Sequence, residues 1–304
     1  MSRYLQFFLI IYFSIIPISS VFSAQSAPDM EKKRILTSFS IIEDITKNIG
    51  RDLVIVNSVV QPGVDSHAYQ ARPTDIIHIP QADLILCNGL GLEESFMKYF
   101  VNLKKGTKIV YVAQGIQPIA VSEDASAEEE PNPHSWLSLN NALIYIKNIR
   151  NALKELDPPN AAAYDRNADE YAQQIRDAVL PLKEKLMAVS PNDRWIVTSE
   201  GCLVYLAEEL GYTPLYLWSL NSDAERSPAQ MREVIDLIRK NKIKFIFSEA
   251  SNSNQPAKQV ARETNATYGG VLYVDSLTKP GGVAPTYLQL LRLLFSTILG
   301  RVSQ

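Results

Sequence analysis

Hydrophobic positions along the chain alternate between strand-like and helix-like patterns, and one long amphipathic stretch interrupts them. From Pro158 to about Val189, apolar or aromatic residues recur at steps of three or four, which places them on one face of a helix. They are Tyr164, Ala168, Tyr171, Ile175, Ala178, Leu182 and Leu186. About thirty residues at ~1.5 Å each would extend roughly 45 Å. This could be a surface helix of one large domain. We favour a helix that links two lobes, because the strand–helix alternation stops before it and restarts after it.

Short apolar or β-branched runs, each followed by a helical pattern, lie on both sides of this stretch. The predicted strands cover residues 34–40, 53–60, 84–87 and 108–113 before it, and 195–198, 215–218, 243–247 and 271–274 after it. Such alternation predicts an α/β fold with two similar α/β lobes, each a mainly parallel sheet flanked by helices, joined by one long linking helix. We expect a signal peptide at 1–24, an N-terminal metal-binding lobe at 31–156, the linking helix at 157–189 and a C-terminal metal-binding lobe at 190–304.

The first residues have the layout of an export signal. Arg3 gives a positive start, residues 7–18 are almost wholly apolar, and small residues follow, with cleavage expected near Ser23 or Ala24. The apolar run is too short for a comfortable membrane span. No cysteine lies near the expected cleavage site. We therefore expect a periplasmic protein without a lipid anchor and without membrane insertion once the signal is cleaved.

Composition narrows the possible partners. A length of 304 residues allows roughly two domains. The formal net charge of -3 gives no indication of a nucleic-acid partner. Cys87 and Cys202 fall in different predicted lobes, each within an apolar run. Two buried free thiols are favoured over a disulfide, because the geometry of a disulfide is restrictive.

Candidate ligands for a metal ion lie on loops and at strand ends. His67 follows a predicted strand, and His134 stands at a loop–helix junction stiffened by two prolines. Glu200 and Asp275 lie at predicted strand ends in the second lobe, where open α/β folds collect ligands. Each also has an ordinary interpretation: a solvated loop histidine, a packing histidine, a helix-capping carboxylate. Taken together, two imidazoles and two carboxylates would form a mixed nitrogen and oxygen site for a divalent first-row metal. Glu249, at another strand end, could face the same crevice.

Several segments resemble the metal-binding solute-binding proteins of bacterial ABC importers, the manganese, iron and zinc class called cluster A-I. They are 62–69 (PGVDSHAY), 132–136 (NPHSW), 198–207 (TSEGCLVYLA), 225–230 (ERSPAQ), 246–249 (IFSE) and 274–277 (VDSL). The resemblance is closest to the iron- and manganese-binding proteins of enteric bacteria. It implies one metal ion at the lobe interface, held by His67, His134, Glu200 and Asp275, and delivery to an ABC permease in the inner membrane. It also implies a transport receptor rather than an enzyme, and we expect a monomer.

The choice of metal depends on the donor atoms. Zinc-specific members commonly have His where this chain has Glu200, and many carry a His-rich loop where 122–130 is acidic and contains no His. Manganese(II) and iron(II) tolerate more oxygen ligands and higher coordination than zinc does. We therefore expect Mn(II) or Fe(II) as the cargo, although Zn(II) can bind in vitro. A zinc-specific receptor is the first alternative. A metallohydrolase with Glu249 as general base is the second, and it lacks a compact motif such as HExxH.

Overall fold

The computed structural model describes residues 32–70, 72, 77–100, 103–120, 130–218 and 228–302. Residues 32–304 form one compact unit. The predicted signal peptide at 1–24 lies outside the described residues, as does nearly all of the acidic segment at 122–130. Among the helices that are described, none is both long and apolar enough to cross a membrane.

The first lobe is built on a parallel sheet with strand order β2-β1-β3-β4. Its elements are β1 (Lys33–Phe39), α1 (Ser40–Gly50), β2 (Val54–Val60), β3 (Leu84–Cys87), α3 (Glu94–Met97), β4 (Lys108–Tyr111) and α4 (Leu139–Leu156). The chain passes from β2 across β1 to β3, so the topological switch point lies between β1 and β3. Loops that leave the carboxyl ends of these strands meet at one edge of the sheet, where such folds bind ligands.

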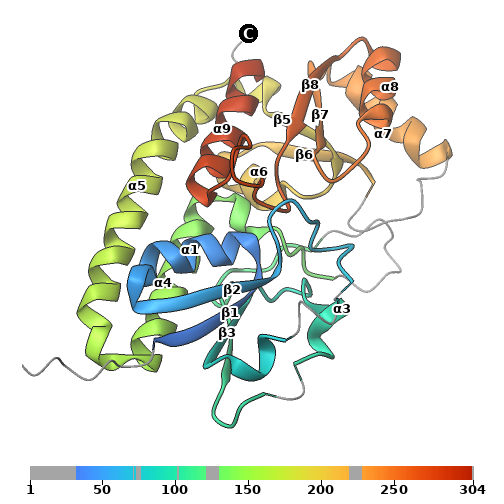
Figure 1. Cartoon of the computed structure of the whole chain (residues 1–304). Coiled ribbons are helices and arrows are strands. Elements are labelled where there is room, and N and C mark those ends of the chain that lie inside the picture. The colour runs from blue at the N-terminus through green and yellow to red at the C-terminus, as the bar shows by residue number, and fades with distance from the viewer. Residues whose placement is uncertain are drawn as a thin grey trace, which may run out of the picture. The chain divides into compact units, whose positions relative to one another are not determined.

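The long helix is α5 (Ala161–Met187), entered through a short 3-10 turn at Pro158–Asn160. It runs along one side of the structure, against α1 and α4 of the first lobe and α9 (Tyr287–Val302) of the second (Figure 1). The predicted apolar face is confirmed: five of its seven positions are buried, and Ala178 and Leu182 pack partly buried against the same core. Pro181 lies inside the helix without ending it.

The second lobe contains two parallel strand pairs, β5–β6 and β7–β8. Its elements are β5 (Trp195–Glu200), α6 (Val204–Leu210), β6 (Thr213–Trp218), α7 (Pro228–Lys240), β7 (Phe245–Glu249), α8 (Gln255–Thr264), β8 (Thr267–Leu272) and α9. β5 lies alongside β7, so the two pairs adjoin (Figure 1). Further 3-10 turns cover Arg51–Leu53, Ile79–Gln81, Ser135–Leu137 and Pro191–Asp193. The predicted two-lobe α/β fold with a long helix is confirmed.

One apolar core extends through both lobes. It includes β1 and β3, the buried face of α5, and residues of α6 and α9, while a second cluster fills the space between β5 to β7 and helices α7 and α8. Because the main core is shared, the boundaries at 31–156, 157–189 and 190–304 stay a prediction. Cys87 and Cys202 are both buried and free, so the interpretation as two free thiols is confirmed.

Candidate metal centre

Contacts within the protein fix the position of His134. The residue is fully buried in the loop that leads into the Ser135–Leu137 turn. The Oδ1 atom of Asn132 accepts hydrogen bonds from the His134 backbone N–H and lies 2.9 Å from its Nδ1. The imidazole packs against Trp136, with ring centroids 5.1 Å apart, and Trp136 in turn contacts Phe39 at the end of β1. These contacts leave Nε2 as the atom that His134 presents to the second lobe.

His67 reaches the same place from the loop that follows β2. The Oδ1 atom of Asp65 accepts the His67 backbone N–H at 2.8 Å, an Asx turn that shapes the loop. Gly63 adopts φ 81°, and its N–H donates to the carbonyl of Leu277 at 2.7 Å. The loop therefore bridges to the second lobe at the segment that contains Asp275.

Asp275 lies three residues beyond the end of β8 at Leu272, not at the strand end as the sequence predicted. The predicted strand 271–274 was wrong in position, since β8 begins at Thr267. The prediction missed the start of β8 because Gly269 weakens the strand signal. A glycine is required there, since a Cβ would lie 2.5 Å from the Phe247 ring. Ser251 Oγ donates to Asp275 Oδ2 at 2.5 Å, and Trp136 Nε1 donates to the carbonyl of Val274 at 2.8 Å.

Three of the four predicted ligands converge. His67 Nε2 lies 2.9 Å from His134 Nε2, His134 Nε2 lies 3.1 Å from Asp275 Oδ1, and His67 Nε2 lies 3.7 Å from Asp275 Oδ1. The side chains of His67 and Asp275 are only 8% and 6% exposed. Two imidazole nitrogens and one carboxylate oxygen therefore lie close together in one small, largely buried volume where the lobes meet.

Glu200, the fourth predicted ligand, lies outside this group of three but close to it. It is the last residue of β5 and is 8% exposed. Asn252 Nδ2 donates to Glu200 Oε2 at 3.2 Å and to Glu249 Oε2 at 3.4 Å, and the other oxygen of Glu249 accepts the backbone N–H of Ser199 at 3.0 Å. Glu249 thus supports the end of β5, behind Glu200.

The electrostatics differ between the two histidines. Burial, together with the charge of His134, lowers the pKa of His67 to about 4, although the charge of Asp275 acts in the opposite direction. Burial also opposes protonation of His134, but the hydrogen bond and charge of Asp275, with the charges of Glu200 and Asp65, together raise its pKa. For Asp275 the same pairing outweighs burial and lowers the pKa. Burial, with the charges of Glu200 and Asp275, raises the pKa of Glu249 to about 7.

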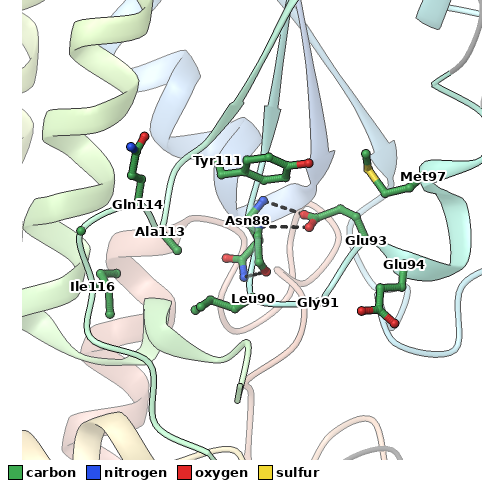
Figure 2. Close-up of a pocket in the computed structure, with 12 residues that line it drawn as sticks. Asn88, Leu90, Gly91, Glu93, Glu94, Met97, Tyr111, Ala113, Gln114 and Ile116 are labelled. Atoms are coloured by element: carbon green, nitrogen blue, oxygen red, sulfur yellow. Dashed lines mark hydrogen bonds between the residues drawn. The ribbon is translucent and has the colours of Figure 1, made fainter. Parts of the chain in front are cut away.

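One cavity lies at the lobe junction, and a larger one lies within the first lobe. A cavity of about 370 Å³ is lined by Asp65, Ser251 and Asp275 among others, so it opens onto the converging ligands. A larger one of about 560 Å³ lies in the first lobe beside Asn88 and Tyr111 and contains none of the predicted ligands (Figure 2). There the buried carboxylate of Glu93 accepts the backbone N–H groups of Asn88 and Gly89.

The supporting residues were missed by reasoning from the sequence. Asn132 and Asp65 each stand two positions before a histidine and accept its backbone N–H. That Asx-x-His spacing is visible in the sequence and is typical of an Asx turn. Ser251 and the bond from Trp136 to Val274 depend on tertiary packing, and no local pattern indicates them.

Comparison with known proteins places these features in context. Residues 35–300 match the family model ZnuA, described as zinc-uptake complex component A periplasmic. The chain is 45% identical over 292 residues to the iron-binding protein YfeA of Yersinia pestis, covering 96% of this chain and 93% of the relative. It resembles the structure of a Mn-bound periplasmic metal binding protein from candidatus Liberibacter asiaticus, with 62% identity and a TM-score of 0.85, covering 89% of this chain and 100% of that one.

A third relative corrects the predicted location. The metal ABC transporter substrate-binding lipoprotein SsaB of Streptococcus sanguinis is 33% identical over 273 residues, covering 88% of each chain, and its name makes it a lipoprotein. Further relatives carry the same word. The expectation of a periplasmic protein without a lipid anchor is therefore wrong. A basic start and an apolar run direct export, but they do not determine how the exported protein is retained.

Proposed function

This chain belongs to the family of zinc-uptake complex component A, and we propose that it captures one divalent metal ion, Mn(II) or Fe(II), between its lobes and delivers it to an ABC-type permease. Metal ABC transporter substrate-binding proteins are among its relatives. The ion is cargo, so the site must bind it tightly and still release it.

The convergence of three acceptor atoms supports this proposal most directly. His67 Nε2, His134 Nε2 and Asp275 Oδ1 are separated by 2.9, 3.1 and 3.7 Å. Around an ion with bonds of ~2.1 Å, neighbouring ligand atoms would lie ~3.0 Å apart in an octahedron and ~3.4 Å apart in a tetrahedron. Lone pairs pointed at one another in a buried volume repel unless a proton or a metal cation lies between them, and a divalent ion would serve all three atoms at once.

Glu200 is proposed as the fourth ligand, contributed by the end of β5. Its charge acts on His134, and it lies beside Asn252 at the same junction. Carboxylates of Glu200 and Asp275 could each offer two oxygens, which suits Mn(II) and Fe(II) better than a tetrahedral zinc site. One relative is named iron-binding and a similar structure is Mn-bound, while the family description names zinc. A zinc-specific receptor is therefore the alternative.

The deciding experiment is a titration of metal-stripped protein with Mn(II), anaerobic Fe(II) and Zn(II), followed by calorimetry. We expect one site that binds Mn(II) or Fe(II) tightly and weakens in Glu200→Ala. Tight binding of Zn(II) alone would establish the zinc receptor instead. Binding of none of the three ions would refute the proposed ligand set and the function with it.

We further propose that the protein is a monomer and has no hydrolase activity. A hydrolytic metal site keeps an open position for water and needs a general base. Glu249, the candidate base, has its carboxylate engaged with the backbone of Ser199 and with Asn252. Ester or peptide hydrolysis that tracked metal occupancy would contradict this, and light scattering tests the monomer.

A further inference from the structure

We infer that Asn132 is a positioning residue for metal capture: it fixes which nitrogen of His134 faces the metal and ties that histidine to the strand end that carries Glu200. The inference rests on the proposed function, since it concerns how the same site is held. Asn132 is fully buried and stands between the two lobes.

The orientation of the Asn132 amide follows from its backbone partners. Its Nδ2 lies 2.7 Å from the carbonyl of Gly201, which can only accept. Its Oδ1 lies 2.9 Å from the backbone N–H of His134, which can only donate. Exchanging the amide oxygen and nitrogen would break both bonds, so the oxygen must face His134.

The tautomer of His134 follows from that orientation. The same Oδ1 atom lies 2.9 Å from Nδ1 of the ring, and an amide oxygen is an acceptor, so Nδ1 must carry the proton. In the neutral ring Nε2 then holds the lone pair, and Nε2 is the atom that lies beside His67 and Asp275. Asn132 thereby aims the donor atom of His134 at the place where the ion binds, as outer partners do in metal sites.

The other side of the amide connects to the second lobe. Gly201 directly follows Glu200, so the bond from Nδ2 links the His134 loop to the end of β5. Tyr205, at the start of α6, donates its hydroxyl proton to the backbone carbonyl of Asn132 at 2.7 Å, and that hydroxyl also accepts the N–H of Ile119. The Asn132 side chain therefore fixes His134 of the first lobe relative to the residue that follows Glu200 in the second.

Two matched pairs of variants test this. Asn132→Ala removes the amide, and Asn167→Ala removes a buried amide that donates to the carbonyl of Ile49 at 2.8 Å, remote from the site. Tyr205→Phe removes the hydroxyl bond to Asn132, and Tyr212→Phe removes a similar buried bond to the carbonyl of Leu186. For each protein we would measure Mn(II) affinity by calorimetry and the Co(II) absorption spectrum, which reports ligand geometry rather than stability.

We expect Asn132→Ala to bind Mn(II) about 10–100-fold more weakly and to alter the Co(II) spectrum, with Asn167→Ala unchanged in both. Tyr205→Phe should bind Mn(II) about fivefold more weakly than Tyr212→Phe. If Asn132→Ala does not fold, this milder pair provides the test. Asn132→Asp keeps the acceptor that faces the ring, so it should restore the Co(II) spectrum.

Equal affinity and an unchanged Co(II) spectrum in Asn132→Ala would overturn the inference, as would equal losses in Tyr205→Phe and Tyr212→Phe. Failure of the wild-type protein to bind Mn(II), Co(II) or Zn(II) would instead overturn the proposed function itself. The two failures are therefore distinguishable.

Discussion

The two histidines of the candidate site reach the same point by different means. His134 is fully buried, bonded at its backbone N–H and at Nδ1 by Asn132, and packed on Trp136. His67 lies on a loop after β2, shaped by Asp65 and by the bond from Gly63 to Leu277. Its ring packs against that of His134, with centroids 4.7 Å apart.

This difference indicates a division of labour. A preformed ligand lowers the cost of ordering the site when the ion arrives, and a loop-borne ligand can leave first when the ion is released. We therefore expect His134 to be the fixed member of the pair and His67 to be the adjustable one. The following predictions test that distinction.

The largest effect is expected from replacing each histidine with alanine. His134→Ala removes a proposed ligand and one of the partners of the buried Asp275, so we expect about 1000-fold weaker Mn(II) binding. His67→Ala should cost about 100-fold, because water can occupy the position it leaves. Competition with a fluorescent chelator measures both, and His78→Ala is the control, since His78 lies in the turn before Ile79–Gln81. Equal losses of Mn(II) affinity in the two variants would contradict the expected difference between His134 and His67.

The pH dependence of binding is the next largest effect. Metal binding requires an unprotonated Nε2. The pKa of His134 is raised, so it holds a proton at mildly acidic pH, whereas that of His67 is about 4. Affinity should therefore fall as pH decreases through the pKa of His134, by about tenfold per pH unit. The proton of His67 should contribute only near pH 4. Calorimetry between pH 6.5 and 5 would show a slope of one, and a slope of two would mean that a second group, His67 or the buried Glu249 with its pKa of about 7, exchanges a proton on binding in the same range.

The sequence predicted the helices and strands better than the residues that hold the candidate ligands in place. The long amphipathic helix follows from spacing at Tyr164, Tyr171 and Ile175, because burial of one face imposes that period. The first sheet was predicted because its strands are rich in buried apolar residues. The strand at Thr267 was misplaced, because Gly269 and Gly270 weaken the strand signal, and Gly269 is needed for the close approach of Phe247.

The candidate site was predicted in part for a similar reason. His67, His134 and Asp275 are residue types with obvious metal chemistry, and the resemblance to a known family supplied their positions. The geometry brings those three together, while Glu200 stays outside their immediate group. Asn132 and Trp136 gave no such signal, since an amide and an indole are ordinary core residues until their bonds to the second lobe are known.

A smaller effect is expected from the indole of Trp136. Trp136→Phe keeps an aromatic ring against His134 but removes the bond from Nε1 to the carbonyl of Val274. That carbonyl would remain buried, so we expect the free energy of unfolding to fall by ~1–3 kcal/mol. Mn(II) affinity should fall by less than about tenfold, because Asp275 loses one neighbouring anchor. Chemical denaturation and calorimetry measure the two changes. Trp195→Phe, at the start of β5, is the control, and an equal loss of affinity there would contradict a specific role.

The smallest effect concerns the loop that carries His67. Asp65→Ala removes the acceptor of the His67 backbone N–H, while Asp65→Asn keeps an acceptor oxygen and removes only the charge. The loss of one such local bond is worth ~1 kcal/mol, so Asp65→Ala should release Mn(II) about fivefold faster, with little change in the unfolding transition. Stopped-flow mixing with excess chelator measures the rate. If Asp65→Asn is as fast as Asp65→Ala, the charge beside Asp275 governs release. If only the alanine variant is fast, the hydrogen bond does, and the loop is the adjustable element. If neither differs from the wild-type protein, the bonds from the Gly63 N–H to Leu277 and Ser276 hold the loop without Asp65, and His67 is as fixed as His134.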